Sequence, residues 1–508
     1  MDNSQNTKRI AKNTLMLYVR MFVTMLISLY TSRVILASLG VEDYGIYNVV
    51  GGIVGMFGVI TSAMNIAISR FITFELGKGD GDRLKRVFST AITIQLIISL
   101  IIVILAETVG LWYLNNIMVI PEERMTAAQW CYQFSIITCV IGLVAVPYNS
   151  AVIAHEKMSV FAFMGIFGAG VTLLVAFLIG HNPFDRLVFY GLLLMLISLL
   201  TQQIYMWYCL RHFKETRFRI TIDKEMLKPM FGFAGWTFFG TSAYILRGQG
   251  SNLLLNYYFG PVVNAARGIS NSVNNAVKQF STNFTTALNP QITKSYAGEN
   301  YDYFNNLVFR GARLSVYLLL FISAPLLLNT EFVLGIWLKE VPEHAVFFTQ
   351  LVLVSSLIEM VSASLITSIT ATGKVKFYYI TIGVVETLNL PVSWILLHLG
   401  CIPETVMIVD IAIAHLSFAA KLYFARKLVN IDVLAFIKKV YFNILIVAAI
   451  GFVLPVIARY SIQEGWLNFF VTSSICVLSM GCSMLFVGCS KNERRFMFEF
   501  VKRKLRRQ

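Results

Sequence analysis

Apolar runs of twenty or more residues recur along the whole chain and are separated by short polar segments. A helical run of this length matches the hydrocarbon thickness of a bilayer. The runs predict about fourteen membrane-spanning helices, at approximately 13–39, 45–74, 86–114, 127–150, 158–180, 186–210, 229–257, 261–291, 304–328, 345–370, 375–399, 404–425, 436–459 and 465–489. The pattern therefore predicts an all-α polytopic membrane protein.

The composition and the placement of charge support a membrane protein. The 508 residues are 57% hydrophobic with a mean hydropathy of +0.69, more than a soluble core could bury. Lys and Arg gather in one set of loops, which holds the N-terminus, Lys78–Arg86, Arg211–Lys228, Lys421–Lys439 and the tail, whereas the other set holds Arg124, Arg186, Lys339 and Arg459. This asymmetry predicts that both termini are cytoplasmic. We interpret the net charge of +15 as a topology signal, not as a nucleic-acid footprint.

The chain contains an internal repeat with a spacing of about 220 residues. Gly40 corresponds to Gly260 and Asp82 to Asp302, and later Ala154–Lys157 corresponds to Ala371–Lys374. The repeat predicts two six-helix lobes, at 1–215 and 225–428, followed by two additional helices at 429–490 and a basic cytoplasmic tail at 491–508. Repeated membrane halves with a path between them are typical of secondary transporters.

Signatures of catalysis are missing from the sequence. It contains no GxxxxGK[ST] loop, HExxH motif or CxxC pair, and the connections between spans are short. We read Glu42-Asp43 as a polar helix connection. We therefore expect no enzyme, no catalytic residue, no metal site and no cofactor beyond an ion gradient.

A polar stripe runs along the eighth predicted span. Its residues recur at i, i+3, i+7, i+10 and i+14: Asn264, Arg267, Asn271, Asn274 and Lys278. Arg267 and Lys278 differ by about 20° around a helix axis, so they share one face, which cannot contact lipid. Together with Arg247 and Arg20 from other spans, this stripe predicts a cationic lumen for an anionic substrate such as a phosphate. Alternatively, each cation pairs with a buried acid.

Other charged residues within spans leave two interpretations open. Arg33 and Arg70 lie near span ends, where they either contact substrate or extend to the interface. The acids Glu359, Glu386 and Asp410, with His415 one turn after Asp410, either pair between helices or include the residue that takes up a proton or Na⁺ during transport.

The segment Arg33-Val-Ile-Leu-Ala-Ser-Leu-Gly-Val-Glu-Asp-Tyr-Gly-Ile-Tyr47 and the later Ile68-Ser-Arg-Phe-Ile72 resemble motifs of bacterial polysaccharide transporters. These are the O-antigen and capsule flippases of the multidrug/oligosaccharidyl-lipid/polysaccharide (MOP) superfamily, which also contains the MATE transporters. The resemblance covers nearly the whole chain. It implies a monomeric flippase of the inner membrane that moves undecaprenyl-diphosphate-linked oligosaccharide to the periplasmic leaflet during polysaccharide or lipopolysaccharide synthesis. It also implies alternating access through a cationic cavity and ion-gradient coupling. From the logic of such a pathway, we expect a glycan polymerase or glycosyltransferases as partners.

On this hypothesis the cations and the amides within the spans bind different parts of the substrate. We assign Arg20, Arg247, Arg267 and Lys278 to the diphosphate or an acidic sugar, and Asn264, Asn271 and Asn274 to sugar hydroxyls, and add Arg33 and Arg70 to the binding set. The alternatives are a MATE-type drug or metabolite exporter, disfavoured because the first span has no acid, and a flippase for the peptidoglycan precursor, lipid II.

Overall fold

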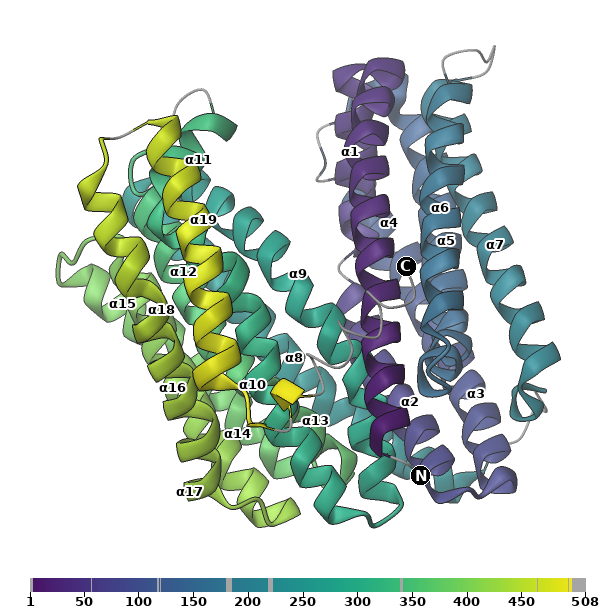
Figure 1. Ribbon diagram of the computed structural model, residues 1–508. Coiled ribbons are helices and arrows are strands. Elements are labelled where there is room, and N and C mark those ends of the chain that lie inside the picture. Colours follow the sequence, from purple (N-terminus) through teal and green to yellow (C-terminus); the bar gives the residue numbers. More distant parts are fainter. Residues whose placement is uncertain are drawn as a thin grey trace, which may run out of the picture. The chain divides into compact units, whose positions relative to one another are not determined.

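The computed structural model describes residues 3–55, 57–116, 118, 120–179, 185–217, 223–338, 341–463, 465–491 and 493–495. Within these ranges the secondary structure is helical and no strand occurs (Figure 1). The chain forms two compact units. Unit 1 comprises Met1–Thr241 with Thr293–Glu299, and unit 2 comprises Ser242–Ile292 with Asn300–Gln508.

Unit 1 is a bundle in which α5 contacts most of the other helices. Its elements are α1 (Asn3–Gly55), α2 (Gly58–Lys78), α3 (Gly81–Leu105), a π-helical turn (Ala106–Gly110), α4 (Leu111–Asn116), α5 (Glu122–Ala154), α6 (Met158–Ile179), α7 (Arg186–His212), a 3-10 turn (Lys214–Thr216) and the first part of α8 (Lys224–Phe259). Helix α5 packs against α1, α2, α3, α6 and α7, and α1 packs along α6. The buried side chains of Val50, Leu114 and Tyr132 lie in its core.

Unit 2 is arranged around α10 and α16. Its elements are the second part of α8, α9 (Pro261–Ala297) up to Ile292, α10 (Tyr301–Leu328), α11 (Thr330–Trp337), α12 (Ala345–Val361), α13 (Ala363–Ala371), α14 (Lys376–Thr387), α15 (Asn389–His398), α16 (Thr405–Val429), α17 (Val433–Phe436), a π-helical turn (Ile437–Tyr441), α18 (Phe442–Ser461), α19 (Trp466–Ser483) and a second π-helical turn (Met484–Gly488). Helix α16 packs against α12, α13, α14 and α15, while α18 and α19 pack on each other and on α10.

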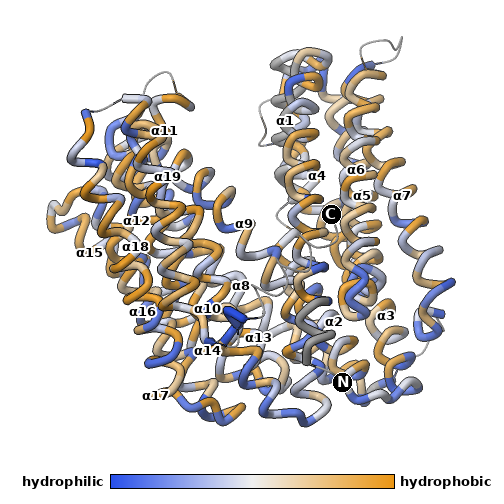
Figure 2. Tube along the Cα trace, in the orientation of Figure 1, coloured by the Kyte–Doolittle hydropathy of each residue, from blue (hydrophilic) through white to orange (hydrophobic). Residues whose placement is uncertain are grey.

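Twelve segments of the described chain are long and apolar enough to cross a membrane, so the expected count of fourteen is not confirmed. The two predicted spans at 229–257 and 261–291 fall in α8 and α9, which are long helices but are not among the twelve. Charged and amide side chains lower the hydropathy of α9 in particular. Figure 2 shows hydrophilic positions along this helix, whereas α18 and α19 are coloured mainly hydrophobic.

The internal repeat reappears in the backbone. The corresponding residues Gly40 and Gly260 both have positive φ, of 82° and 79°, a conformation that glycine adopts without steric cost. Glu156 and Gly373, which correspond in the later part of the repeat, have φ of 59° and 76°. The similarity between the two halves therefore includes the chain reversals as well as the apolar runs.

Corresponding residues of the two halves also cap the first turns of α3 and α10. Asp80 accepts a hydrogen bond from the Arg83 amide at the start of α3, and Asn300 accepts one from the Tyr303 amide at the start of α10. Such side chains satisfy backbone donors that have no partner within the helix.

The predicted lobes and the compact units divide the chain differently. The units separate within α8, between Thr241 and Ser242, whereas the predicted lobes end in the loop after residue 215. The lobe boundaries therefore stay a prediction about the repeat. Most of the predicted tail, residues 491–508, lies outside the described residues.

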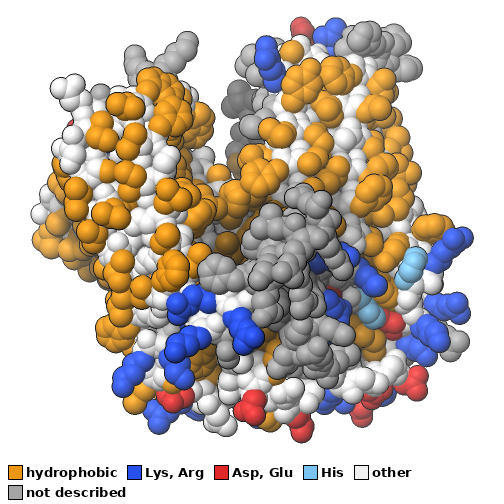
Figure 3. All heavy atoms as spheres, viewed as in Figure 1, with side chains coloured by type: hydrophobic (Ala, Val, Ile, Leu, Met, Phe, Trp, Pro, Cys, Tyr) orange, Lys and Arg blue, Asp and Glu red, His pale blue; other side chains and the backbone are white. Residues whose placement is uncertain are grey.

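The outer surfaces of the helices are apolar. The apolar residues Leu100, Phe163 and Leu478 are 62%, 63% and 68% exposed, which is unfavourable in water but not in contact with lipid hydrocarbon. Figure 3 shows hydrophobic side chains over much of the visible face, with Lys and Arg gathered mostly at one end of each unit. The chain is therefore a multi-pass membrane protein.

Candidate functional site

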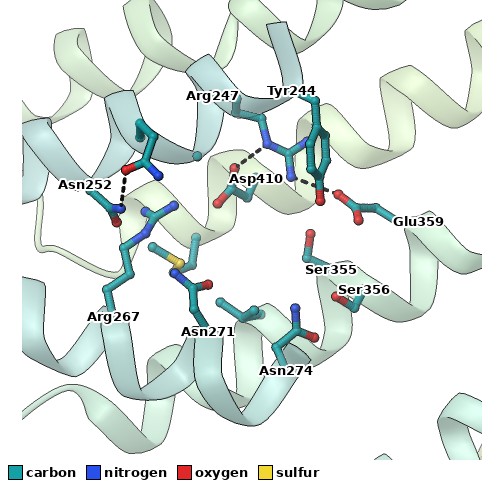
Figure 4. A pocket seen from close by; sticks show the side chains of 14 residues that line it. Tyr244, Arg247, Asn252, Arg267, Asn271, Asn274, Ser355, Ser356, Glu359 and Asp410 are labelled. Carbon is teal, nitrogen blue, oxygen red and sulfur yellow. Dashed lines mark hydrogen bonds and ion pairs between the residues drawn. The ribbon is translucent and has the colours of Figure 1, made fainter. Parts of the chain in front are cut away.

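The polar stripe of α9 lines a cavity within unit 2. The cavity has a volume of about 180 Å³, and polar side chains from α8, α9, α12 and α16 surround it. In Figure 4, Arg267, Asn271 and Asn274 project from one helix toward this space. Arg267 and Asn274 are buried, at 5% and 9% exposure. Asn264 and Lys278 lie on the same helix but are not among the residues that line the cavity.

Arg247 of α8 binds three carboxylates from three different helices. Its Nη2 donates to Glu359 Oε1 of α12 at 2.9 Å, its Nη1 donates to Glu386 Oε2 of α14, and its Nε lies 3.2 Å from Asp410 Oδ1 of α16. The planar guanidinium presents its donors in several directions, which allows one side chain to serve three partners. Arg247 thus connects α8 with α12, α14 and α16 in the interior of unit 2.

The carboxylates are held by further hydrogen bonds. Lys278 Nζ donates to Glu359 Oε2 at 2.8 Å, so Glu359 bridges α8 and α9. Ser417 Oγ donates to Glu386 Oε1 at 2.9 Å, and Asn389 Nδ2 donates to Asp410 Oδ1 at 2.8 Å. Ion pairs that are buried and also hydrogen-bonded offset much of the cost of removing the charges from water.

Of the two interpretations that the sequence left open for these cations, the structure shows the ion-paired one for Arg247 and Lys278. Glu359, Glu386 and Asp410 are their partners. His415 lies apart from the cavity: it is exposed, and its ring nitrogens contact the Ile411 carbonyl and the Tyr441 hydroxyl.

Arg267 differs from the other cations of the cluster. Its Nε and Nη1 are buried and have no hydrogen-bond partner among the described residues. Lys421, which is also buried, places its Nζ 3.4 Å from Ser362 Oγ. Four cations, Arg247, Arg267, Lys278 and Lys421, therefore accompany the three carboxylates, and one positive charge is left over. Because Arg267 lines the cavity and two of its nitrogens have no hydrogen-bond partner among the described residues, the cavity is suited to an anion.

The remaining predicted cations belong to unit 1. The Arg20 guanidinium lies 4.3 Å from the centre of the Phe161 ring, and that of Arg70 lies 4.4 Å from the centre of the Phe74 ring, both favourable cation–π distances. Arg33 is exposed. The structure thus groups Arg247, Arg267 and Lys278 in one cluster and places Arg20, Arg33 and Arg70 in the other unit.

Sequence analysis missed three polar residues of the cluster: Asn389, Ser417 and Lys421. Asp410, Ser417 and Lys421 recur at i, i+7 and i+11, which is one face of a helix. Asn389 follows Glu386 at i+3. The helical period of polar residues within apolar spans could have found all three.

Removing the bridging carboxylate should destabilise unit 2. Glu359→Ala leaves Arg247 with one partner fewer and Lys278 without its ion pair, which we expect to cost about 3–5 kcal/mol. Thermal unfolding of the purified protein in detergent measures the loss. Adding Lys278→Met should restore part of the stability, because the unpaired ammonium is gone. Glu331→Gln, on an exposed position of α11, is the control. An unchanged unfolding temperature in Glu359→Ala would contradict this account of the cluster.

Comparisons with known proteins agree with the predicted family. Residues 10–296 match the family model described as polysaccharide biosynthesis protein. No curated protein sequence matches the chain.

Solved structures of MATE transporters share the fold. An outward-facing multidrug resistance MATE family transporter of the MOP superfamily has 13% sequence identity and a TM-score of 0.71, with 84% of this chain and 98% of that chain covered. The MATE transporter ClbM in complex with Rb⁺ has 15% identity and a TM-score of 0.68, with coverages of 82% and 94%.

A third similar structure is a MOP superfamily transporter from Pyrococcus furiosus, described as having a binding pocket of reverse polarity. It has 14% identity and a TM-score of 0.67, with coverages of 86% and 99%. The family match spans more than half of the sequence and confirms the resemblance that the opening motif indicated. The chain belongs to the polysaccharide biosynthesis protein family and has the fold of MATE-type membrane transporters.

Proposed function

We propose that this protein is a flippase that moves an undecaprenyl-diphosphate-linked oligosaccharide, an O-antigen or capsule repeat unit, from the cytoplasmic to the periplasmic leaflet. Such a substrate combines an anionic diphosphate, a polar glycan and a polyprenyl tail. The first two need a polar path through the membrane, whereas the tail is compatible with lipid.

The observation that carries this proposal is the buried Arg267 on the cavity lining, beside a cluster in which cations outnumber carboxylates. A guanidinium that is 5% exposed, with two nitrogens lacking hydrogen-bond partners among the described residues, is costly without a ligand. A phosphate oxygen would satisfy these donors through charge-assisted hydrogen bonds. Asn271 and Asn274 beside it supply amides for further phosphate oxygens or for sugar hydroxyls.

The same charge balance disfavours a cationic drug as substrate. All three carboxylates of the cluster already contact Arg247, so an incoming cation would meet a net positive site. The peptidoglycan precursor carries the same diphosphate-lipid group and remains the second candidate. Rescue of a bacterium depleted of its own precursor flippase would favour that substrate.

Arg267→Ala should abolish surface glycan while the protein stays in the membrane. We expect at least a tenfold loss of glycan, because charge-assisted hydrogen bonds of about 1.5–3 kcal/mol each are removed. Arg267→Lys should have an intermediate effect, since it keeps the charge but loses the bidentate geometry. Glycan display and membrane content are measured in the native bacterium by gel analysis and immunoblot.

Arg426→Ala is the matched control, because Arg426 is an exposed cation near the end of α16, away from the cavity. It should display normal glycan. Normal display by Arg267→Ala would contradict the assignment of the anion site.

We further propose that a proton or Na⁺ gradient drives transport and that Asp410 is the coupling residue. Its Oδ1 lies 3.2 Å from Arg247 Nε, so neutralising this carboxylate weakens one contact of Arg247 and increases the net positive charge beside the anion site. In proteoliposomes, an imposed pH or Na⁺ gradient should accelerate transport by the native protein. Asp410→Asn should retain gradient-independent transport and lose the acceleration. If neither gradient changes the transport rate of the native protein, ion coupling is ruled out.

For orientation we propose that the protein resides in the bacterial inner membrane with both termini cytoplasmic. Arg124, on the side we assign to the periplasm, pairs with Asp43 at 2.6 Å and with Asp185 at 2.5 Å. Partial burial of Asp185 opposes ionisation, but the hydrogen bonds from Arg124 lower its pKa below the ordinary value. An alkaline phosphatase fused after Gln508 should be inactive; an active fusion would reverse the orientation.

A further inference from the structure

Unit 1 contains a second cavity, which differs chemically from the one in unit 2. Its volume is about 660 Å³, within the range of small-molecule binding sites. Helices α1, α2, α5, α6 and α7 form its walls, and none of the described residues that line it is charged. Its polar groups are instead hydroxyls and one amide, including Ser62, Asn65, Ser135, Thr138 and Thr172.

The hydroxyls of this cavity are arranged as hydrogen-bond acceptors. Ser62 and Ser135 donate their protons to the carbonyls of Gly58 and Cys131, each at 2.8 Å. Thr138 donates to the Phe134 carbonyl at 2.8 Å, and Thr172 to the Gly168 carbonyl at 2.9 Å. Each proton is thus used within its own helix, and the oxygen lone pairs remain for a ligand. A ligand with several hydrogen-bond donors therefore suits this wall.

Four glycines of the lining adjoin the free space of the cavity. A Cβ atom built at Gly51, Gly55, Gly58 or Gly142 would meet no atom within 4 Å, so these lining positions adjoin free space. Glycine within a helix costs about 0.5–1 kcal/mol relative to alanine. Phe134 adds an aromatic lining side chain, against which the apolar face of a sugar ring can pack.

We propose that this cavity, hereafter the unit 1 pocket, binds neutral sugars of the transported glycan. This inference rests on the proposed flippase function and assigns the glycan a binding site separate from the anion site at Arg267. Sugar hydroxyls supply the donors that the wall requires. A cationic ligand would find no counter-charge among the lining residues, and an acidic sugar would find no cation.

The test compares two probes in proteoliposomes: the complete lipid-linked oligosaccharide from the native bacterium, and undecaprenyl diphosphate carrying a single sugar. Gly142→Leu places a side chain in the pocket. We expect it to slow transport of the oligosaccharide at least tenfold and to change that of the single-sugar probe less than twofold. Thr138→Val, which keeps the shape and removes one acceptor, should slow the oligosaccharide about two- to fivefold, the loss expected for one hydrogen bond.

Gly170→Leu of α6 is the matched control, since its Cβ position is also open but does not line the pocket. It should transport both probes at the native rate. Size-exclusion profiles and unfolding temperatures identify any variant that fails to fold. If Gly142→Leu does not fold, Thr138→Val tests the pocket: it should slow transport of the oligosaccharide but not of the single-sugar probe.

The outcomes separate this inference from the function on which it rests. A folded Gly142→Leu variant that slows both probes equally, or neither, overturns the glycan pocket while the flippase function stands. If the native protein transports neither probe, the flippase proposal fails, and the pocket assignment fails with it.

Discussion

The contact of Arg247 with Glu359, Glu386 and Asp410 is the interaction on which the interior of unit 2 depends. Each of these ions would be costly to bury alone, and together they connect α8 with α12, α14 and α16. Lys278 adds α9 to the same group through Glu359. The polar helices α8 and α9 can therefore lie within a membrane protein because their charges are compensated by acids on apolar helices.

The carboxylates do not balance all of the cations in the cluster, and the excess positive charge indicates which ligand the cavity suits. The acids bind Arg247 and Lys278, but the described residues give no hydrogen-bond partner to two nitrogens of Arg267. A site built for stability alone would not leave a buried guanidinium in this state. A ligand with oxygen acceptors and negative charge would complete it. The ion-paired Arg247 and Lys278 stabilise the cluster, whereas Arg267 keeps donors without partners at the cavity, which favours an anionic substrate.

The two cavities differ in chemistry, and each suits a different part of the proposed lipid-linked substrate. The cavity of unit 2 offers charge and amides at Arg267, Asn271 and Asn274, whereas that of unit 1 offers uncharged acceptors such as Ser62 and Thr138. Charged groups select a phosphate strongly but bind neutral sugars no better than amides and hydroxyls do. On the proposed function, separate environments would allow the diphosphate and the glycan to be recognised by different residues.

Much of the fold could be predicted from the sequence, because apolar length and repeated glycines report on single helices and turns. The positive φ at Gly40 and Gly260 is an example. The polar face of α9 was also predictable from its helical period. The partner of each charged residue was not predictable. The helical period shows which residues share a face, but it does not show that Arg247 contacts Glu386 rather than a lumen. The unit 1 pocket was equally hidden, since isolated Ser, Thr and Gly in apolar helices resemble ordinary packing residues.

The central claim is that this protein moves a lipid-linked glycan across the membrane. Deleting its gene in the native bacterium and determining the leaflet and amount of lipid-linked intermediates tests that claim most directly. The account predicts loss of surface glycan, with oligosaccharide-diphospholipid accumulating on the cytoplasmic side. Unchanged surface glycan without any accumulated intermediate, accompanied by altered sensitivity to cationic toxins, would contradict it and favour an efflux transporter.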